Sequence, residues 1–206
     1  MALEGAKASG AVLELVKWVF SFPAMLGTFL VGWAFSVLRN FYVDPDVWWH
    51  IRVGQDILRT HHWPTTDSYS FTAAGTPWIA YEWLGDAALG SVAQWGGLAS
   101  LFGFLMTMAV LVIIGLFYLA TLRSGNSKAG FVSASLMSTL ALISMTLRPQ
   151  MIGYLFLVVL LIVLEYFRKG VSWPMWGLPL LFMVWVNVHG SFVWGLGCCV
   201  FICVPD

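Results

Sequence analysis

The residues of this chain best suited to chemistry stand together in residues 44–50, whose sequence is DPDVWWH. Asp44 and Asp46 carry carboxylates and His50 carries an imidazole, and both kinds of group can take up or release a proton during a reaction. The segment follows the first apolar stretch that is long enough to cross a bilayer. Charged side chains at the mouth of a membrane helix are costly to keep there. Residues 44–50 therefore favour chemistry on a lipid-anchored substrate over simple anchoring.

The composition is typical of an integral membrane protein. Hydrophobic residues make up 60% of the 206 residues and charged residues only 10%, whereas about a quarter of the residues in a soluble domain are charged. The net charge is zero and the basic residues are scattered, which argues against a nucleic-acid partner. The three cysteines lie in the last apolar segment without the spacing of a zinc site or a disulfide framework, so we interpret them as packing residues.

Charged residues divide the apolar sequence into about six predicted membrane spans. A helix needs roughly 20 apolar residues to cross a bilayer. Segments that approach this length lie at residues 18–38, 98–122, 129–147, 150–164, 173–188 and 191–206. The sequence therefore predicts an all-α, polytopic transmembrane helical bundle that forms a single module over residues 1–206.

Lysines and arginines predict the orientation of this bundle, because cytoplasmic loops carry an excess of them. With six spans, three basic pairs fall on the same side, namely Lys7 with Lys17, Arg123 with Lys128, and Arg168 with Lys169. That side, with the N-terminus, is expected to be cytoplasmic. The long loop of residues 40–97 then faces outside, together with Arg148 and His189. We therefore expect Asp44, Arg148 and His189 to surround one cavity near the lipid headgroups.

The first half of the external loop, which spans residues 40–97, is predicted to form a helix over residues 45–59. Asp44 or Asp46 can cap this helix, since a proline follows Asp44 and suits the first helical position. Asp46 and His50 are four residues apart and could pair on one flank. The predicted apolar face consists of Val47, Ile51, Gly54 and Leu58, widened by Trp48.

The second half of the loop is predicted to form a hairpin over residues 69–79 and a helix over residues 80–94. Glu82 and Asp86 lie on this helix and are interpreted as surface acids, although Glu82 stands in a motif considered below. The glycines at 96–97 end the loop. Two juxtamembrane amphipathic helices on the outer leaflet suit this loop better than a free soluble domain.

Five stretches of the chain resemble a known family of membrane enzymes. They are DPDVWWHIRVGQDIL from residue 44, PTTDSYSFTAAGTPW from residue 64, YEWL from residue 81, LRPQ from residue 147 and VNVHG from residue 186. Together they resemble bacterial GT-C-type glycosyltransferases, which are polytopic enzymes that use polyprenyl-phosphate sugars and are related to the protein O-mannosyltransferases and oligosaccharyltransferases. The pattern D-x-D-x-W-W-H behind a first membrane span is the most specific of these features, and the resemblance covers most of the chain.

The resemblance implies roles for the charged residues. Asp44, as the first acid after span one, would contact the acceptor or act as its base. Asp46 would be its partner or, with Asp44, a ligand to a divalent cation such as Mg²⁺ or Mn²⁺. Arg148 would steady the donor phosphate. The expected catalytic residues are thus Asp44 and Asp46, and the residues expected to bind substrate are Trp48, Trp49, His50, Glu82, Arg148 and His189.

The expected function is transfer of a sugar from a polyprenyl-phosphate donor to an acceptor on the external face of a bacterial inner membrane. The chain would act as the N-terminal part or a shortened member of such an enzyme, with membrane lipid and the lipid-linked sugar as partners. The alternative is a non-catalytic scaffold subunit of a larger membrane complex, in which Asp44 and Asp46 only cap a helix and Arg148 only reaches toward headgroups. A transporter is disfavoured because the two halves show no inverted repeat.

Overall fold

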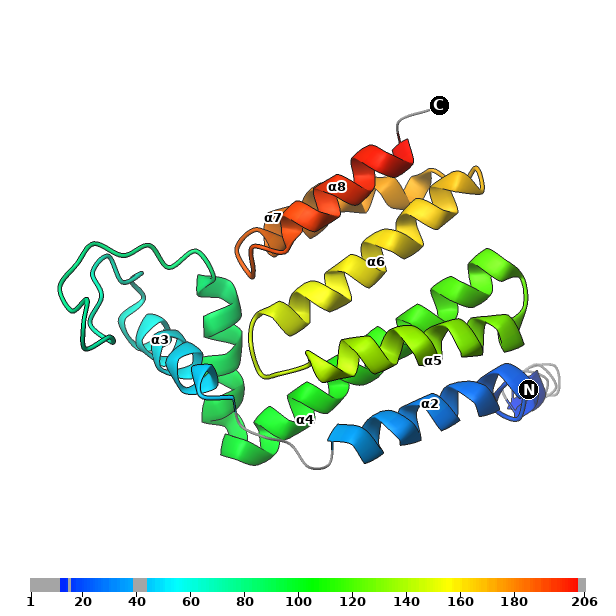
Figure 1. Cartoon of the computed structure of the whole chain (residues 1–206), viewed down its shortest axis with the longest axis horizontal. Coiled ribbons are helices and arrows are strands. Elements are labelled where there is room, and N and C mark those ends of the chain that lie inside the picture. Colours follow the sequence, from blue (N-terminus) through cyan, green and yellow to red (C-terminus); the bar gives the residue numbers. More distant parts are fainter. Residues whose placement is uncertain (1–11, 15, 39–43, 204–206) are drawn as a thin grey trace, which may run out of the picture.

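A computed structural model describes residues 12–14, 16–38 and 44–203 of the chain (Figure 1). The predicted all-α fold is confirmed for these residues. The structure bounds α2 (Phe22–Leu38), α3 (Asp46–Thr60), α4 (Trp83–Ser124), α5 (Ser127–Ile143), α6 (Gln150–Arg168), the 3-10 helix η1 (Trp173–Gly177), α7 (Leu178–Trp185) and α8 (Phe192–Cys203). Lys7 and residues 40–43, where the predicted loop begins, lie outside the described residues.

The prediction of about six membrane spans is wrong. Within the described ranges, α4 and α6 are long and apolar enough to cross a membrane, and a third candidate is the pair Val12–Val19 and α2, which is bent by 56°. The other helices are shorter: α5 has 17 residues, α7 has eight and α8 has 12. At 1.5 Å per residue, α7 reaches only about 12 Å of a hydrocarbon core about 30 Å thick. The apolar stretches looked longer in the sequence because they include the turns between these helices.

α4 is the central helix of the bundle and packs against α2, α5 and α6 (Figure 1). Leu105, Ala109 and Ile113 follow one another at four-residue spacing along α4, and all three are buried. One face of α4 therefore lies in the shared core. α6 packs closely on α4 at Gly115, where an added Cβ would stand 2.5 Å from Val158 Cγ1.

Trp185 is the centre of a second, smaller core between α6, α7 and α8. It is fully buried together with Leu160 and Leu164 of α6. Its indole N–H donates a hydrogen bond to the Ser191 hydroxyl at 3.0 Å, across the turn between α7 and α8. This core fixes the α7–α8 turn, which carries His189, at the end of the bundle where α3 lies (Figure 1).

α3 crosses the first turns of α4 with the two backbones in contact. A Cβ added to Gly54 of α3 would lie 1.8 Å from the carbonyl oxygen of Asp86, and one added to Gly90 of α4 would lie 2.8 Å from the backbone nitrogen of Gln55. A side chain at either position would force the helices apart. The two glycines therefore set how α3 is placed on α4.

The predicted apolar face of α3 is confirmed in part. Val47, Ile51 and Gly54 are buried against α4, and the helix ends at Thr60, one residue beyond the predicted end. Trp48 does not widen this face, because it is 54% exposed.

α4 consists of two parts that meet at a break. Gly96 and Gly97 have non-helical backbone conformations, and Gly97 has a φ of +61°, in the left-handed region that favours glycine. The break coincides with the predicted end of the loop at residues 96–97, and the helix predicted over residues 80–94 begins at Trp83 instead of residue 80. The break separates the part that carries site residues from the part that forms the bundle.

Candidate functional site

Asp44 and Arg148 form a two-bond ion pair at the end of the bundle. Arg148 Nε donates to Asp44 Oδ2 and Nη2 donates to Oδ1, each at 2.9 Å. Nη2 also lies 2.8 Å from Oδ2 of Asp46. Each partner immediately precedes a proline with helical backbone angles, Pro45 before α3 and Pro149 before α6. The starts of α3 and α6 therefore direct one acidic and one basic side chain toward each other.

This pairing changes what Asp44 can do chemically. The bonds from Arg148 hold the pKa of Asp44 below its usual range despite partial burial, with a further contribution from the Asp46 N–H, which donates to Asp44 Oδ1 at 3.0 Å. A carboxylate with a lowered pKa is a weaker base. The base role that the family resemblance implies for Asp44 stays a prediction, and this arrangement does not favour it.

The expected divalent cation at Asp44 and Asp46 does not fit this arrangement. The guanidinium of Arg148 already lies between the two carboxylates and balances their charge. Over residues 12–14, 16–38 and 44–203, no group of three or more His, Cys, Asp or Glu residues is placed to hold a metal ion. We therefore derive no step that passes through a metal.

His50 of α3 pairs with Asp86 of α4. Nδ1 of His50 lies 2.6 Å from Asp86 Oδ1, and Asp86 is only 2% exposed. The interpretation of Asp86 as a surface acid is therefore wrong, and His50 does not pair with Asp46. A sequence signal for this contact exists: His50 lies four residues before Gly54, and Asp86 lies four residues before Gly90. Because helices that cross at glycines lie close together, the side chains one turn away on the same faces can meet.

Glu82 and His189 form a third pair, between the start of α4 and the α7–α8 turn. His189 Nε2 lies 3.6 Å from Glu82 Oε1. Asn187 joins the two segments, since its carbonyl accepts the Leu84 N–H at 3.1 Å and its side-chain oxygen accepts the Trp83 indole N–H at 2.8 Å. Asn187 was not among the residues expected in the site.

Burial drives both members of this third pair toward their neutral forms. It raises the pKa of Glu82, an effect that nearby Asp86 adds to and that His50 and Arg148 oppose. It lowers the pKa of His189, and the charge of His50 lowers it further. Loss of solvent disfavours the charged form of either group.

Two hollows lie at this cluster. The smaller, of about 140 Å³, is lined by His50, Glu82 and Asp86 and by the indoles of Trp49 and Trp78, which are in edge-to-face contact at 5.5 Å between ring centres. The larger, of about 280 Å³, is lined by His189, Gln150, Tyr154, Ser191 and Trp194, among others. Because Glu82 and His189 touch, the pair connects the walls of the two hollows.

The structure thus brings together almost all the predicted site residues. Those that meet are Asp44, Asp46, Trp49, His50, Glu82, Arg148 and His189, and Asp86 joins them. Trp48 does not take part, because it is largely exposed and lines neither hollow. The expected convergence of the first loop, Arg148 and His189 is therefore found.

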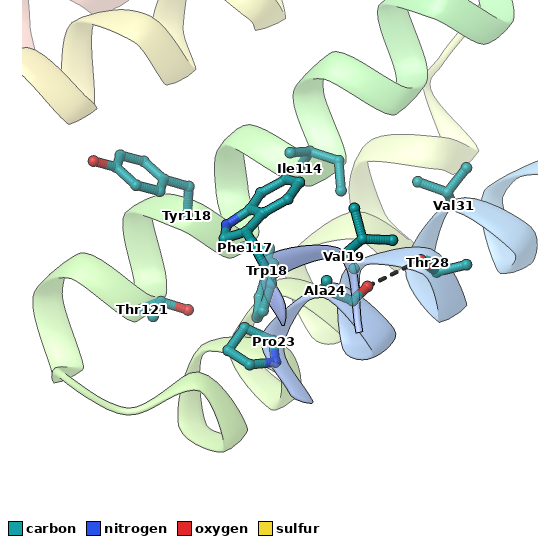
Figure 2. Close-up of a pocket in the computed structure, with 11 residues that line it drawn as sticks. Trp18, Val19, Pro23, Ala24, Thr28, Val31, Ile114, Phe117, Tyr118 and Thr121 are labelled. Atoms are coloured by element: carbon teal, nitrogen blue, oxygen red, sulfur yellow. Dashed lines mark hydrogen bonds between the residues drawn. The ribbon is translucent and has the colours of Figure 1, made fainter. Parts of the chain in front are cut away.

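A larger apolar groove, of about 510 Å³, lies at the opposite end of the bundle (Figure 2). Trp18 and Pro23 line one side, and Ile114, Phe117 and Tyr118 of α4 line the other. The polar contact in view is a hydrogen bond from the Thr28 hydroxyl to the Ala24 carbonyl at 2.9 Å. Among the described residues no charged side chain lines the groove, and it is separate from the candidate site.

Asp67 organises the loop between α3 and α4, where a hairpin over residues 69–79 was predicted. Its Oδ1 accepts the N–H groups of Tyr69 and Ser70 at 2.8 and 2.9 Å, and its Oδ2 accepts the Ser70 hydroxyl at 2.5 Å. The hydrogen bonds from Ser70 and Tyr69 hold the pKa of Asp67 below its usual range. The pairing that remains of a hairpin is the single bridge between Thr66 and Pro77.

Acid should loosen this loop. Because the pKa of Asp67 is lowered by folding, its carboxylate stabilises the loop fully above the unfolded value of about 3.9, and this stabilisation is lost as the pH falls through the lower folded pKa. We expect the amides of Tyr69 and Ser70 to have lower hydrogen-exchange protection factors at pH 3 than at pH 6. Asp67→Asn should lower protection already at pH 6. Equal protection in this variant and the wild type would contradict the role given to Asp67.

Comparisons with protein-family models, with curated proteins and with solved structures found no match to this chain. The candidate site accordingly depends on the residues and their geometry.

Proposed function

We propose that this protein is a membrane glycosyltransferase that moves a sugar from a polyprenyl-phosphate donor to an acceptor hydroxyl. The observation that carries the proposal is the gathering of Asp44, Arg148, His50, Asp86 and the Glu82–His189 pair at one end of helices of membrane length. Keeping so many ionisable groups beside apolar helices is costly, and such groups are typical of functional sites.

The reaction has two chemical requirements that these groups can meet. An acceptor hydroxyl needs a group to take its proton, and a departing phosphate needs positive charge. Arg148 is 38% exposed at its side chain, and its bonds to Asp44 use Nε and Nη2. Nη1 makes no hydrogen bond to any residue that the structure describes, so it can meet a phosphate oxygen while Asp44 holds the guanidinium in place.

The position of the site suits a lipid-linked donor. A polyprenyl chain lies within the bilayer, so its phosphate stays near the headgroups, and the cluster stands where α6 begins. The two hollows give separate places for two substrates, one beside His189 and Gln150 and one beside Trp49 and Trp78. We propose that this end of the bundle faces outward from a bacterial inner membrane, with the N-terminus cytoplasmic. Arg123 at the end of α4, Lys128 at the start of α5 and Arg168 at the end of α6 lie at the other end of these helices, and cytoplasmic ends carry an excess of basic residues.

A scaffold subunit is the second candidate. The acids and bases of the cluster satisfy one another, as Asp44 with Arg148 and His50 with Asp86 do, and a purely structural ion-pair network would need the same. A scaffold would hold these pairs without turning over a sugar donor.

The test is transfer by membranes that contain the full 206-residue chain. These membranes would be given a panel of undecaprenyl phosphates, each carrying a different ¹⁴C-labelled sugar, beside membranes from cells with an empty vector. We expect one donor to release label from the organic phase into a non-lipid product above the vector level. Transfer at the vector level with every donor would overturn the proposal. Recovery of the chain as a stoichiometric member of an assembly would then favour the scaffold.

A further inference from the structure

We propose that His50, positioned by Asp86, is the group that takes the proton from the acceptor hydroxyl. This inference rests on the proposed function and gives it a base other than the acid that the sequence suggested. The hydroxyl would enter the 140 Å³ hollow lined by His50, Trp49 and Trp78.

Asp44 is poorly placed for this task. Both of its carboxylate oxygens accept hydrogen bonds from Arg148, and Oδ1 also accepts the Asp46 N–H. If Asp44 took up a proton, some of these hydrogen bonds would break, and the guanidinium of Arg148 would lose the charge that balances it. Asp44 therefore acts through Arg148, which makes it a positioning residue.

His50 and Asp86 have the geometry of an imidazole oriented by a carboxylate. The 2.6 Å contact joins Nδ1 of His50 to Oδ1 of Asp86. When Asp86 is ionised, Nδ1–H donates to it, and the lone pair of Nε2 is left to accept a proton. Nε2 makes no hydrogen bond to a residue of the described ranges. The side chain of His50 is 13% exposed and that of Asp86 3%, so water competes little with either contact.

The glycine crossing keeps this pair together. His50 and Asp86 lie on different helices, and their contact depends on the close approach of α3 and α4 at Gly54 and Gly90. The groups that approach a substrate in this hollow are held by packed helices, which is what precise proton transfer requires.

The proposed step balances in atoms and charge. The acceptor O–H bond breaks and its proton goes to Nε2 of His50, while the acceptor oxygen forms a bond to the anomeric carbon of the sugar. The bond from that carbon to the phosphate oxygen breaks, and its electron pair leaves with the polyprenyl phosphate, whose charge faces Arg148. The imidazolium that forms is balanced by the carboxylate of Asp86.

The first test is chemical rescue of transfer. His50→Ala should lower the transfer rate by about 100-fold or more, as loss of a general base does, and added imidazole should restore part of it. Asp86→Asn should lower the rate with little change in KM and should not respond to imidazole. His62→Ala, in which an exposed histidine just beyond α3 is removed, is the matched control and should transfer at the wild-type rate.

The outcomes separate this inference from the proposed function. If the wild type transfers sugar and His50→Ala does so equally well, or is slow and never responds to imidazole, His50 is not the base and the proposed function stands. If the wild type transfers nothing from any donor of the panel, the proposed function fails and the inference fails with it.

A second measurement does not depend on turnover. Nitrogen-15 spectra of the solubilised full chain labelled at its four histidines would show which ring nitrogen of His50 carries the proton, with His50→Gln assigning the signal. We expect the proton on Nδ1 in the wild type and a change of this signature in Asp86→Asn. A proton on Nε2 in the wild type would overturn the inference.

Discussion

Asp44→Asn should reduce sugar transfer by about a thousand-fold, the scale expected when a preorganised charge is removed from a reacting group. Asparagine keeps the shape of aspartate but cannot balance the guanidinium of Arg148, which would no longer be held by two bonds in one orientation. The measurement is the transfer rate per mole of folded protein in membranes, with expression checked in parallel. Arg148→Lys should be nearly as inactive, because an ammonium keeps the charge but loses the two-bond geometry.

The matched control for this prediction is Asp56→Asn. Asp56 is an acid within α3 that, like Asp44, pairs with arginine, with Arg52 at 3.2 Å and Arg59 at 2.9 Å, but it lines neither hollow of the site. The Asp56→Asn variant should transfer sugar at close to the wild-type rate. Unchanged transfer in Asp44→Asn would reject a catalytic centre at this ion pair. Equal losses in both variants would mean that Asp44 and Asp56 both act through folding and that Asp44 has no special part in transfer.

Gly54→Ala should destabilise the protein by at least about 2 kcal/mol, because overpacking of a tight contact usually costs 1–3 kcal/mol. The added methyl group would stand 1.8 Å from the carbonyl oxygen of Asp86. This oxygen is a backbone atom, so it cannot move away unless the helix itself shifts. The helices must separate, and the 2.6 Å contact between His50 and Asp86 should lengthen with them. The thermal midpoint in detergent, followed by tryptophan fluorescence, would therefore fall together with transfer.

Gly32→Ala is the control for the glycine prediction. Gly32 lies inside α2, and no heavy atom stands within 4 Å of the position that its Cβ would take. Alanine is a better helix former than glycine by about 1 kcal/mol, so this variant should be as stable as the wild type or more so. Equal midpoints for the two alanine variants would show that α3 does not rest on α4 at Gly54.

The sequence predicted the site better than the bundle. Asp44 and Arg148 are 104 residues apart, yet the distribution of lysine and arginine predicted that both lie on one side of the membrane near one cavity; the direct ion pair between them was not predicted. The role of Asp86 could not be recovered in the same way. An acid on an amphipathic helix is most often a surface residue, and only the shared glycine spacing on α3 and α4 marks this one as different.

The predicted number of membrane spans was wrong for a physical reason. The spans predicted over residues 173–188 and 191–206 correspond to η1 with α7 and to α8, which are shorter than a membrane span. Hydropathy shows that these residues are apolar but does not show where each helix begins and ends. The turn between α7 and α8 is held by polar contacts of Asn187, His189 and Ser191. Of these three residues only His189 was expected in the site, and all three lie between the end of α7 and the start of α8.

The sequence separation of the paired residues fixes when each contact can form during synthesis, since a chain emerges from its N-terminus. His50 and Asp86 are 36 residues apart, so their contact can form as soon as the first turns of α4 have left the ribosome. Asp44 can pair with Arg148 only after 104 further residues have been synthesised. A nascent chain that ends before α6 would therefore hold its imidazole–carboxylate contact while the acid beside it still lacks a counter-ion.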